Sequence, residues 1–123
     1  MRLELIGDRG QCFSLAWLID DDGRCYGKEF LARCQGHKQN RTVACFERAK
    51  DRLPGHKSLK ALRHDMNGFL EIRPTEQIVY FCFESEGVLV ITNGCMKRGS
   101  VDEPHKTRAK ELRARWQAAH ERL

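Results

Sequence analysis

The pattern of apolar and polar positions begins with two stretches that are typical of strands. Residues 12–19 form a continuous apolar run with aromatic content, bounded by Gly10 and by the turn-forming residues 20–23. A run of this length between turn signals predicts a buried strand. Weaker alternation over residues 2–6 predicts a further short strand at the start of the chain.

A second group of strand-like stretches lies close together in the chain, at residues 69–73, 78–83 and 88–96. Asn67-Gly68 precedes the first stretch, and residues 84–87 separate the last two, as the turns of hairpins do. Residues 78–83 are apolar on both faces. The pattern predicts an antiparallel meander whose core includes Phe81, Phe83, Val88 and Val90.

Three other stretches have the spacing of amphipathic helices, which repeats every three to four residues. Residues 26–34 predict a short helix that ends near Gly36, and residues 42–53 predict a second helix with Asn40 as its N-cap. The apolar positions of this second helix are Val43, Phe46, Ala49 and Leu53. Residues 104–122 predict a long third helix, with Pro104 in its first turn and a stripe of Ala109, Leu112, Trp116 and Ala119.

The expected order of elements is therefore strand, helix, helix, three strands and a final helix, with one additional strand at the N-terminus. This order predicts a two-layer α+β fold in which the helices lie on one side of a mainly antiparallel sheet. The 123 residues fit one domain, whose core we expect over about residues 11–116.

Positive charge is concentrated in two blocks of the chain. The formal net charge is +5, and residues 48–63 carry six cationic residues and one carboxylate, while residues 97–123 carry eight and four. Such blocks favour a polyanionic partner or an acidic protein. Solvated helix faces would produce the same composition.

The remaining composition excludes several classes of protein. No apolar run approaches the roughly 18 residues that span a bilayer, and the first ten residues lack the apolar segment of a signal peptide. We therefore expect a cytoplasmic protein with reduced thiols: Cys12, Cys45, Cys82 and Cys95 in the core, Cys25 and Cys34 nearer the surface. A structural zinc site is the weaker alternative, because no CxxC pair is present, and no cofactor is expected. Phosphate-loop, HExxH, GxSxG and kinase motifs are absent as well, which disfavours common metabolic enzymes.

Three segments together resemble a known family. They are DDGRCYGKEFLARC at residues 21–34, LKALRHDMNGFLEIR at residues 59–73, and VLVITNGCMKRGSVDEPHKTRAKEL at residues 88–112. Their order and spacing are similar to those of the RelE/ParE toxin superfamily, in particular its phage-related HigB-like branch. The resemblance implies a RelE-like fold and the toxin of a bacterial or phage type II toxin–antitoxin pair. Such a toxin is a metal-free endoribonuclease that cleaves mRNA, either on the ribosome or as free mRNA. In some branches of the family the toxin is instead a gyrase poison. An antitoxin protein would be its partner.

The resemblance also implies roles for individual residues. Arg73, at the end of the LEIR segment, corresponds to a phosphate-binding arginine, and Lys97 and Arg98 correspond to paired basic residues after the last strand. These three would be catalytic, because a cationic fork suits the charged phosphate of the transition state. His56, Lys57, Lys60 and Arg63 correspond to a basic connector and would bind the RNA backbone.

The sequence departs from the family pattern at two positions. Gln77 stands near a second family arginine, and Asn93 stands near a family histidine and cannot act as a general base. The remaining candidates for a proton-transfer group are His56, His64 and His105. The alternative interpretation is a non-catalytic module that keeps the fold and binds nucleic acid or an acidic protein.

Overall fold

The structure is a computed structural model, which describes residues 1–97 and 103–121. The first half of the chain contains β1 (Arg2–Leu5), β2 (Ser14–Ile19), α1 (Tyr26–Arg33) and α2 (Gly36–Lys50). The second half contains β3 (Lys60–Ala61), the 3-10 turn η1 (His64–Met66), β4 (Leu70–Thr75), β5 (Ile78–Ser85), β6 (Val88–Met96) and α3 (Glu103–Glu121). No described helix combines the length and the apolar character that crossing a bilayer requires.

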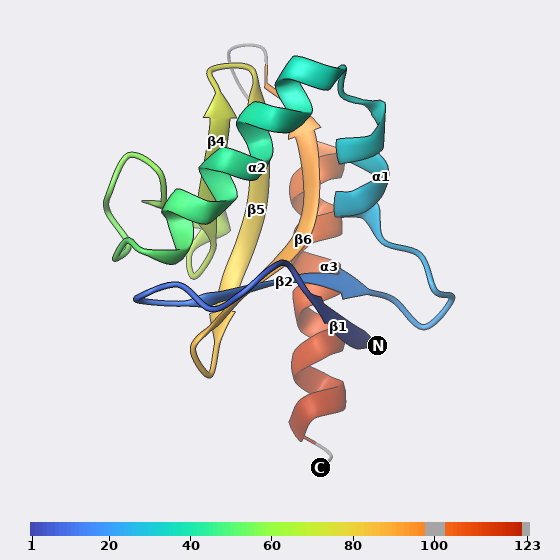
Figure 1. Cartoon of the computed structure of the whole chain (residues 1–123). Helices are drawn as coiled ribbons and strands as arrows, with labels where there is room; N and C mark the ends of the chain where they lie inside the picture. The colour runs from blue at the N-terminus through green and yellow to red at the C-terminus, as the bar shows by residue number, and fades with distance from the viewer. Residues whose placement is uncertain (98–102, 122–123) are drawn as a thin grey trace.

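The six strands form one mixed sheet in the order β1-β2-β6-β5-β4-β3 (Figure 1). The predicted meander is confirmed, since β4 pairs antiparallel with β5 and β5 pairs antiparallel with β6. β2 lies parallel to β6, and the chain between them passes through α1 and α2 and the other strands. The α+β class and the mainly antiparallel sheet are thus confirmed, and β2 with β6 is the parallel pair of this mixed sheet among the described strands.

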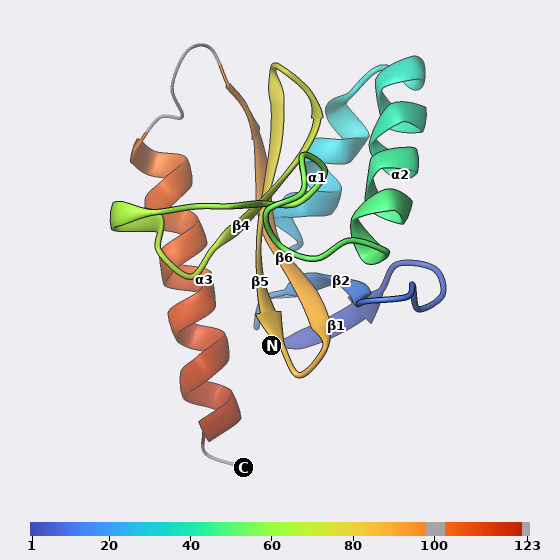
Figure 2. The ribbon, with the colours of Figure 1, turned by 90° about the vertical axis from the view of Figure 1, so that its left-hand side faces the viewer.

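Helices cover both faces of this sheet (Figure 2). Ile78, Tyr80 and Cys82 of β5 belong to the core beneath α1 and α2. The alternating residues Val79, Phe81 and Phe83 belong to the core beneath α3. The prediction that the helices lie on one side was therefore wrong for α3. The reason is that β5 is apolar on both faces, and both faces need cover from water.

The helix predicted at residues 42–53 is α2, which begins earlier than expected, at Gly36. Asn40 lies inside the helix and Gln35 is the N-cap residue. Gln39 explains the early start, since its side-chain amide donates to the carbonyls of Leu31 and Cys34 at 3.1 and 2.9 Å and joins the two helices tightly.

The buried face of α2 also differs from the predicted stripe. Phe46 and Ala49 are buried as expected, but Val43 is 47 % exposed and Leu53, beyond the helix, is 69 % exposed. The α2 face that meets the sheet is instead completed by Thr42 and Cys45.

No disulfide joins any of the six cysteines, all of which belong to the described residues. Cys45, Cys82 and Cys95 are buried, as predicted. Cys25 is buried as well, against expectation, and Cys12 is half-buried because it lies in the loop between β1 and β2. Burial raises the pKa of the Cys25 and Cys45 thiols.

Candidate nucleic-acid interface

Arg73 lies on β4 and is fixed by the carboxylate of Glu71, two residues earlier. Its Nε and Nη2 atoms donate to Glu71 Oε1 at 2.9 and 2.6 Å. The Glu71 side chain is only 4 % exposed, whereas the Arg73 side chain is 30 % exposed. Two of the five N–H groups of the guanidinium are thus directed at Glu71, and the others remain available to an anion.

Two hollows of the surface meet at Arg73. The larger, of about 620 Å³, is lined by Arg73 and by His37, Lys38, Arg41, Thr75, Glu76 and Gln77. The smaller, of about 400 Å³, is lined by Arg73 and by Cys45, Arg48, Arg52, His56, Lys57 and Ser58. We call the two hollows together the α2–β4 tract. Its lining contains six lysine or arginine side chains and a single carboxylate, that of Glu76.

Helical geometry explains why α2 contributes so many of these charges. Besides His37, the residues between positions 36 and 52 that line the tract are Lys38, Arg41, Cys45, Arg48 and Arg52. They follow one another at intervals of three and four residues, so they form one stripe along the helix. Burial of Phe46 and Ala49 against the sheet turns this stripe toward β4 and Arg73.

His56 and Lys57 reach the smaller hollow from the turn after α2. The Ser58 N–H donates to His56 Nδ1 at 3.1 Å, and an isolated bridge joins His56 to Leu59, which is fully buried. Because Nδ1 accepts this bond, the neutral ring carries its proton on Nε2. His56 therefore offers a hydrogen-bond donor to a ligand in the hollow.

The other predicted site residues lie outside the two hollows. Lys60 is exposed on β3, opposite Glu71 in the strand register, and Arg63 is exposed just before η1. Lys97 lies at the end of β6, where its N–H donates to the Gln77 carbonyl at 2.6 Å. Since Gln77 lines the larger hollow, Lys97 lies next to the tract without lining it. Arg98 lies outside the described residues.

The two positions that depart from the family pattern have different surroundings. Gln77 lines the tract together with Arg73. Asn93 is buried, and its Nδ2 donates to the His105 carbonyl at 3.0 Å while its Oδ1 accepts from Thr92 Oγ1 at 2.8 Å. Asn93 thus links β6 to the first turn of α3 by a hydrogen bond. Of the three candidate histidines, His56 alone shares a hollow with Arg73 within the described part of the chain.

Lys38 and Arg41 were not among the predicted site residues, and Arg48 and Arg52 were noted only as part of a basic block. The available signal was the placement of basic residues at positions 38, 41, 48 and 52, which lie on one face of a helix.

No protein-family model matches the chain, and none of the curated proteins matches it either. The relationship to RelE/ParE toxins therefore stays a prediction from the three sequence segments.

Proposed function

We propose that the protein binds single-stranded RNA along the α2–β4 tract and acts as a toxin-like endoribonuclease of a type II toxin–antitoxin pair. The observation that carries this proposal is the charge of the tract, where six cationic side chains and one carboxylate line two adjoining hollows. Clustered cations repel one another, and a phosphate backbone relieves that repulsion. The resemblance of the three sequence segments to RelE/ParE toxins supports RNA as the polyanion.

The chemistry requires no metal ion. The ribose 2′-oxygen attacks the adjacent phosphorus, the bond to the 5′-oxygen breaks, and the products are a 2′,3′-cyclic phosphate and a 5′-hydroxyl. Arg73 and Lys57 would stabilise the negative charge of the pentacoordinate phosphate, and His56 Nε2–H would donate to one of its oxygens. The proton of the 2′-hydroxyl would leave to water, and water would protonate the departing 5′-oxygen.

The second candidate function is RNA binding without cleavage. The specific observation in its favour is the bond from the Ser58 N–H to His56 Nδ1, which holds His56 in the tautomer that cannot accept a proton at Nε2. Gln77 and Asn93 support it too, because neither amide is a general base.

Binding is tested by fluorescence anisotropy with a labelled 20-nucleotide RNA at several salt concentrations. Contacts to about six phosphates of a single strand predict that log K falls with log salt with a slope of about −4. The variant Arg48→Gln/Arg52→Gln should flatten the slope by about 1.4. Arg2→Gln/Arg115→Gln removes two exposed arginines outside the tract and serves as the charge-matched control, with an unchanged slope. Equal losses in both variants would refute specific binding along the tract.

Cleavage is tested by expressing the protein in cells, measuring growth and mapping the ends of the mRNA. We expect growth arrest and cleavage by the wild type. We expect a loss of about 10²-fold in cleavage when Arg73 and Glu71 are both replaced by glutamine. A folded wild type that binds RNA but neither arrests growth nor cleaves mRNA would support the non-catalytic candidate.

A further inference from the structure

The second half of β6 has an open edge on the side opposite β5. β5 pairs with β6 as far as Met96, whereas the pairs of β2 with β6 end at Ile91. The register shift between Phe81 and Cys82 places one extra β6 residue at this point, which turns β6 away from β2. No described strand pairs with β6 beyond Ile91 on that side.

Strand alternation indicates which groups point to this open edge. The Lys97 N–H donates to the carbonyl of Gln77, the residue just before β5, so the N–H and C=O of Lys97 face β5. Alternate residues of a strand direct their N–H and C=O to opposite sides. Gly94 and Met96 therefore present their N–H and C=O groups to the open edge.

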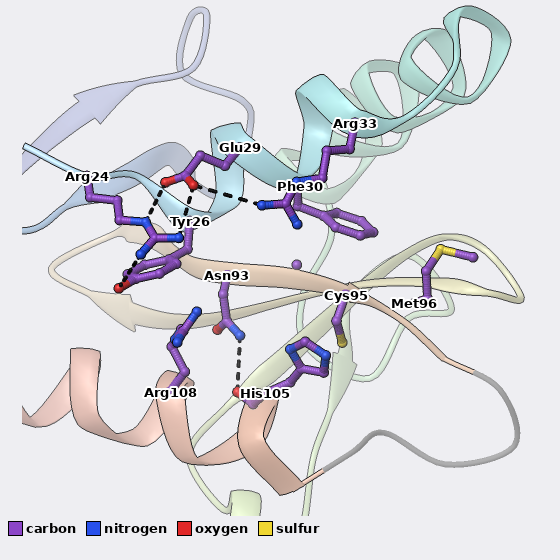
Figure 3. Close-up of a pocket in the computed structure, with 11 residues that line it drawn as sticks. Arg24, Tyr26, Glu29, Phe30, Arg33, Asn93, Cys95, Met96, His105 and Arg108 are labelled. Atoms are coloured by element: carbon purple, nitrogen blue, oxygen red, sulfur yellow. Dashed lines mark hydrogen bonds and ion pairs between the residues drawn. The ribbon is translucent and has the colours of Figure 1, made fainter.

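A hollow of about 270 Å³ lies at this edge, between α1, β6 and α3 (Figure 3). Its floor includes Gly94, Met96 and the ring of Phe30. Besides Asn93 of β6, its polar side chains come from α1, the loop before it and α3, and they are Arg24, Tyr26, Glu29, Arg33, His105 and Arg108. The lining thus combines apolar and main-chain groups with cationic side chains.

The three arginines differ in how closely each is paired with a carboxylate. Arg24 binds Glu29 through two bonds of 2.9 and 3.2 Å, and these hydrogen bonds are the main cause that lowers the pKa of Glu29. Arg33 lies 4.0 Å from the same carboxylate and is 72 % exposed. Arg108 has no carboxylate within 4.0 Å among the described residues. Glu29 alone opposes the three cations, so the lining carries two uncompensated positive charges.

Tyr26 fixes the position of Arg108. The guanidinium carbons of Arg24 and Arg108 each lie 4.2 Å from the centre of the Tyr26 ring. Figure 3 shows Arg24 on the α1 side of the ring and Arg108 on the α3 side. Stacking on an aromatic ring leaves the N–H groups at the rim of a guanidinium free for an anion.

We propose that this hollow binds one nucleotide, with its phosphate at Arg33 and Arg108 and its base against the open edge of β6 at Gly94 and Met96. Every base has adjacent donor and acceptor groups on one edge, and these match the N–H and C=O of an unpaired strand residue. The site does not depend on the proposed RNA function. Its ligand is a free mononucleotide or one nucleotide of a bound strand.

The hollow lies close enough to the α2–β4 tract for its ligand to be one nucleotide of a bound RNA strand. Met96 is paired with Ile78, which follows Gln77 of the α2–β4 tract. Arg33 ends α1, and His37 of the tract lies in the first turn of α2. An RNA strand along the tract can therefore continue past this end of the sheet and place a nucleotide in the hollow.

The first experiment titrates the full chain with AMP, with CMP and with inorganic phosphate by calorimetry. We expect both nucleotides to bind with Kd below about 1 mM, and phosphate to bind at least about tenfold more weakly because it lacks the base. Arg33→Gln/Arg108→Gln should weaken AMP binding about tenfold or more, with its thermal unfolding unchanged. Arg2→Gln/Arg115→Gln, at two exposed arginines outside both the hollow and the α2–β4 tract, is the charge-matched control that should bind AMP normally.

Three results would overturn the site. They are no heat with AMP up to several millimolar, equal affinity for AMP and phosphate, and equal loss in the charge-matched control. The RNA titration with the same variants identifies the source of the nucleotide. Weaker RNA binding by Arg33→Gln/Arg108→Gln assigns it to the bound strand, and unchanged RNA binding assigns it to a free nucleotide.

Discussion

Replacing Arg73 alone should destabilise the fold as well as remove a phosphate-binding group. The Glu71 carboxylate beside it is 4 % exposed and receives two bonds from Arg73. Breaking a fully buried ion pair from one side costs about 3–5 kcal/mol, because the remaining charge is left without a partner. Water reaches the Arg73 side chain, which is 30 % exposed. We therefore expect Arg73→Ala to lower the free energy of unfolding by about 2–3 kcal/mol.

In a domain of this size, that loss lowers Tm by roughly 8–12 °C. The matched variant is Glu71→Gln/Arg73→Gln, in which neither side chain is charged and two amides can bond to each other. It should regain at least about 1 kcal/mol relative to Arg73→Ala, because the buried carboxylate is gone.

Thermal and urea unfolding, followed by circular dichroism, measure these differences. The reasoning fails if Arg73→Ala loses less than about 1 kcal/mol, or if the double variant is less stable than the single one. If the reasoning holds, cleavage has to be compared in the double variant. Loss of activity in Arg73→Ala would otherwise combine unfolding with the loss of a transition-state contact.

Three further predictions concern the packing and the ion pairs. Gly27→Ala should cost about 1–3 kcal/mol in urea unfolding, because a Cβ at this buried helical position would lie 2.6 Å from the Trp17 ring. Tyr80→Phe should leave the free energy of unfolding unchanged or raise it by up to about 1 kcal/mol, since the buried hydroxyl has no hydrogen-bond partner among the described residues; a clear loss would contradict this. The pKa of Glu29 is lowered in the fold, chiefly by its hydrogen bonds from Arg24. The ionised Glu29 carboxylate therefore stabilises the fold at pH values above its unfolded pKa near 4.5. This stabilisation disappears as the pH falls through the lower pKa of the folded state. Glu29→Gln should therefore lower Tm slightly at pH 7 and not in strong acid, and the same decrease at both pH values would refute the assignment.

Local signals in the sequence were enough to predict most of the elements. The meander follows from short apolar runs between turns, and Gly87, with φ of 79°, has the backbone that such a hairpin turn needs. The placement of α3 required a further step. Residues 78–83 are apolar on both faces, and a strand of that kind needs a layer on each side. The start of α2 was predicted too late because the bonds of Gln39 to the end of α1 form only when two helices meet.

The candidate sites were less predictable because they depend on contacts between distant segments. Arg73 was predicted as a phosphate-binding residue and His56 and Lys57 as RNA-binding residues, and the three line one hollow. The hollow beside β6 depends on the register shift between Phe81 and Cys82. The extra residue is Thr92 of β6, and its type does not signal a shift, because threonine is also common in regular strands.

The orientation of α2 links the stability of the fold to the charge of the tract. Phe46 and Ala49 are buried against the sheet, and Arg48 lies between them in sequence but about 100° away from Ala49 around the helix. The apolar face therefore fixes the direction in which the cationic stripe points. Because the stripe points toward Arg73, its positive charges lie together in the lining of the tract, where the described residues include one carboxylate, that of Glu76. Repulsion among these cations opposes folding, and burial of the α2 face offsets it. A bound polyanion would remove the repulsion without changing the core. Ligand binding at the tract should therefore raise the stability of the whole domain, and most strongly at low salt.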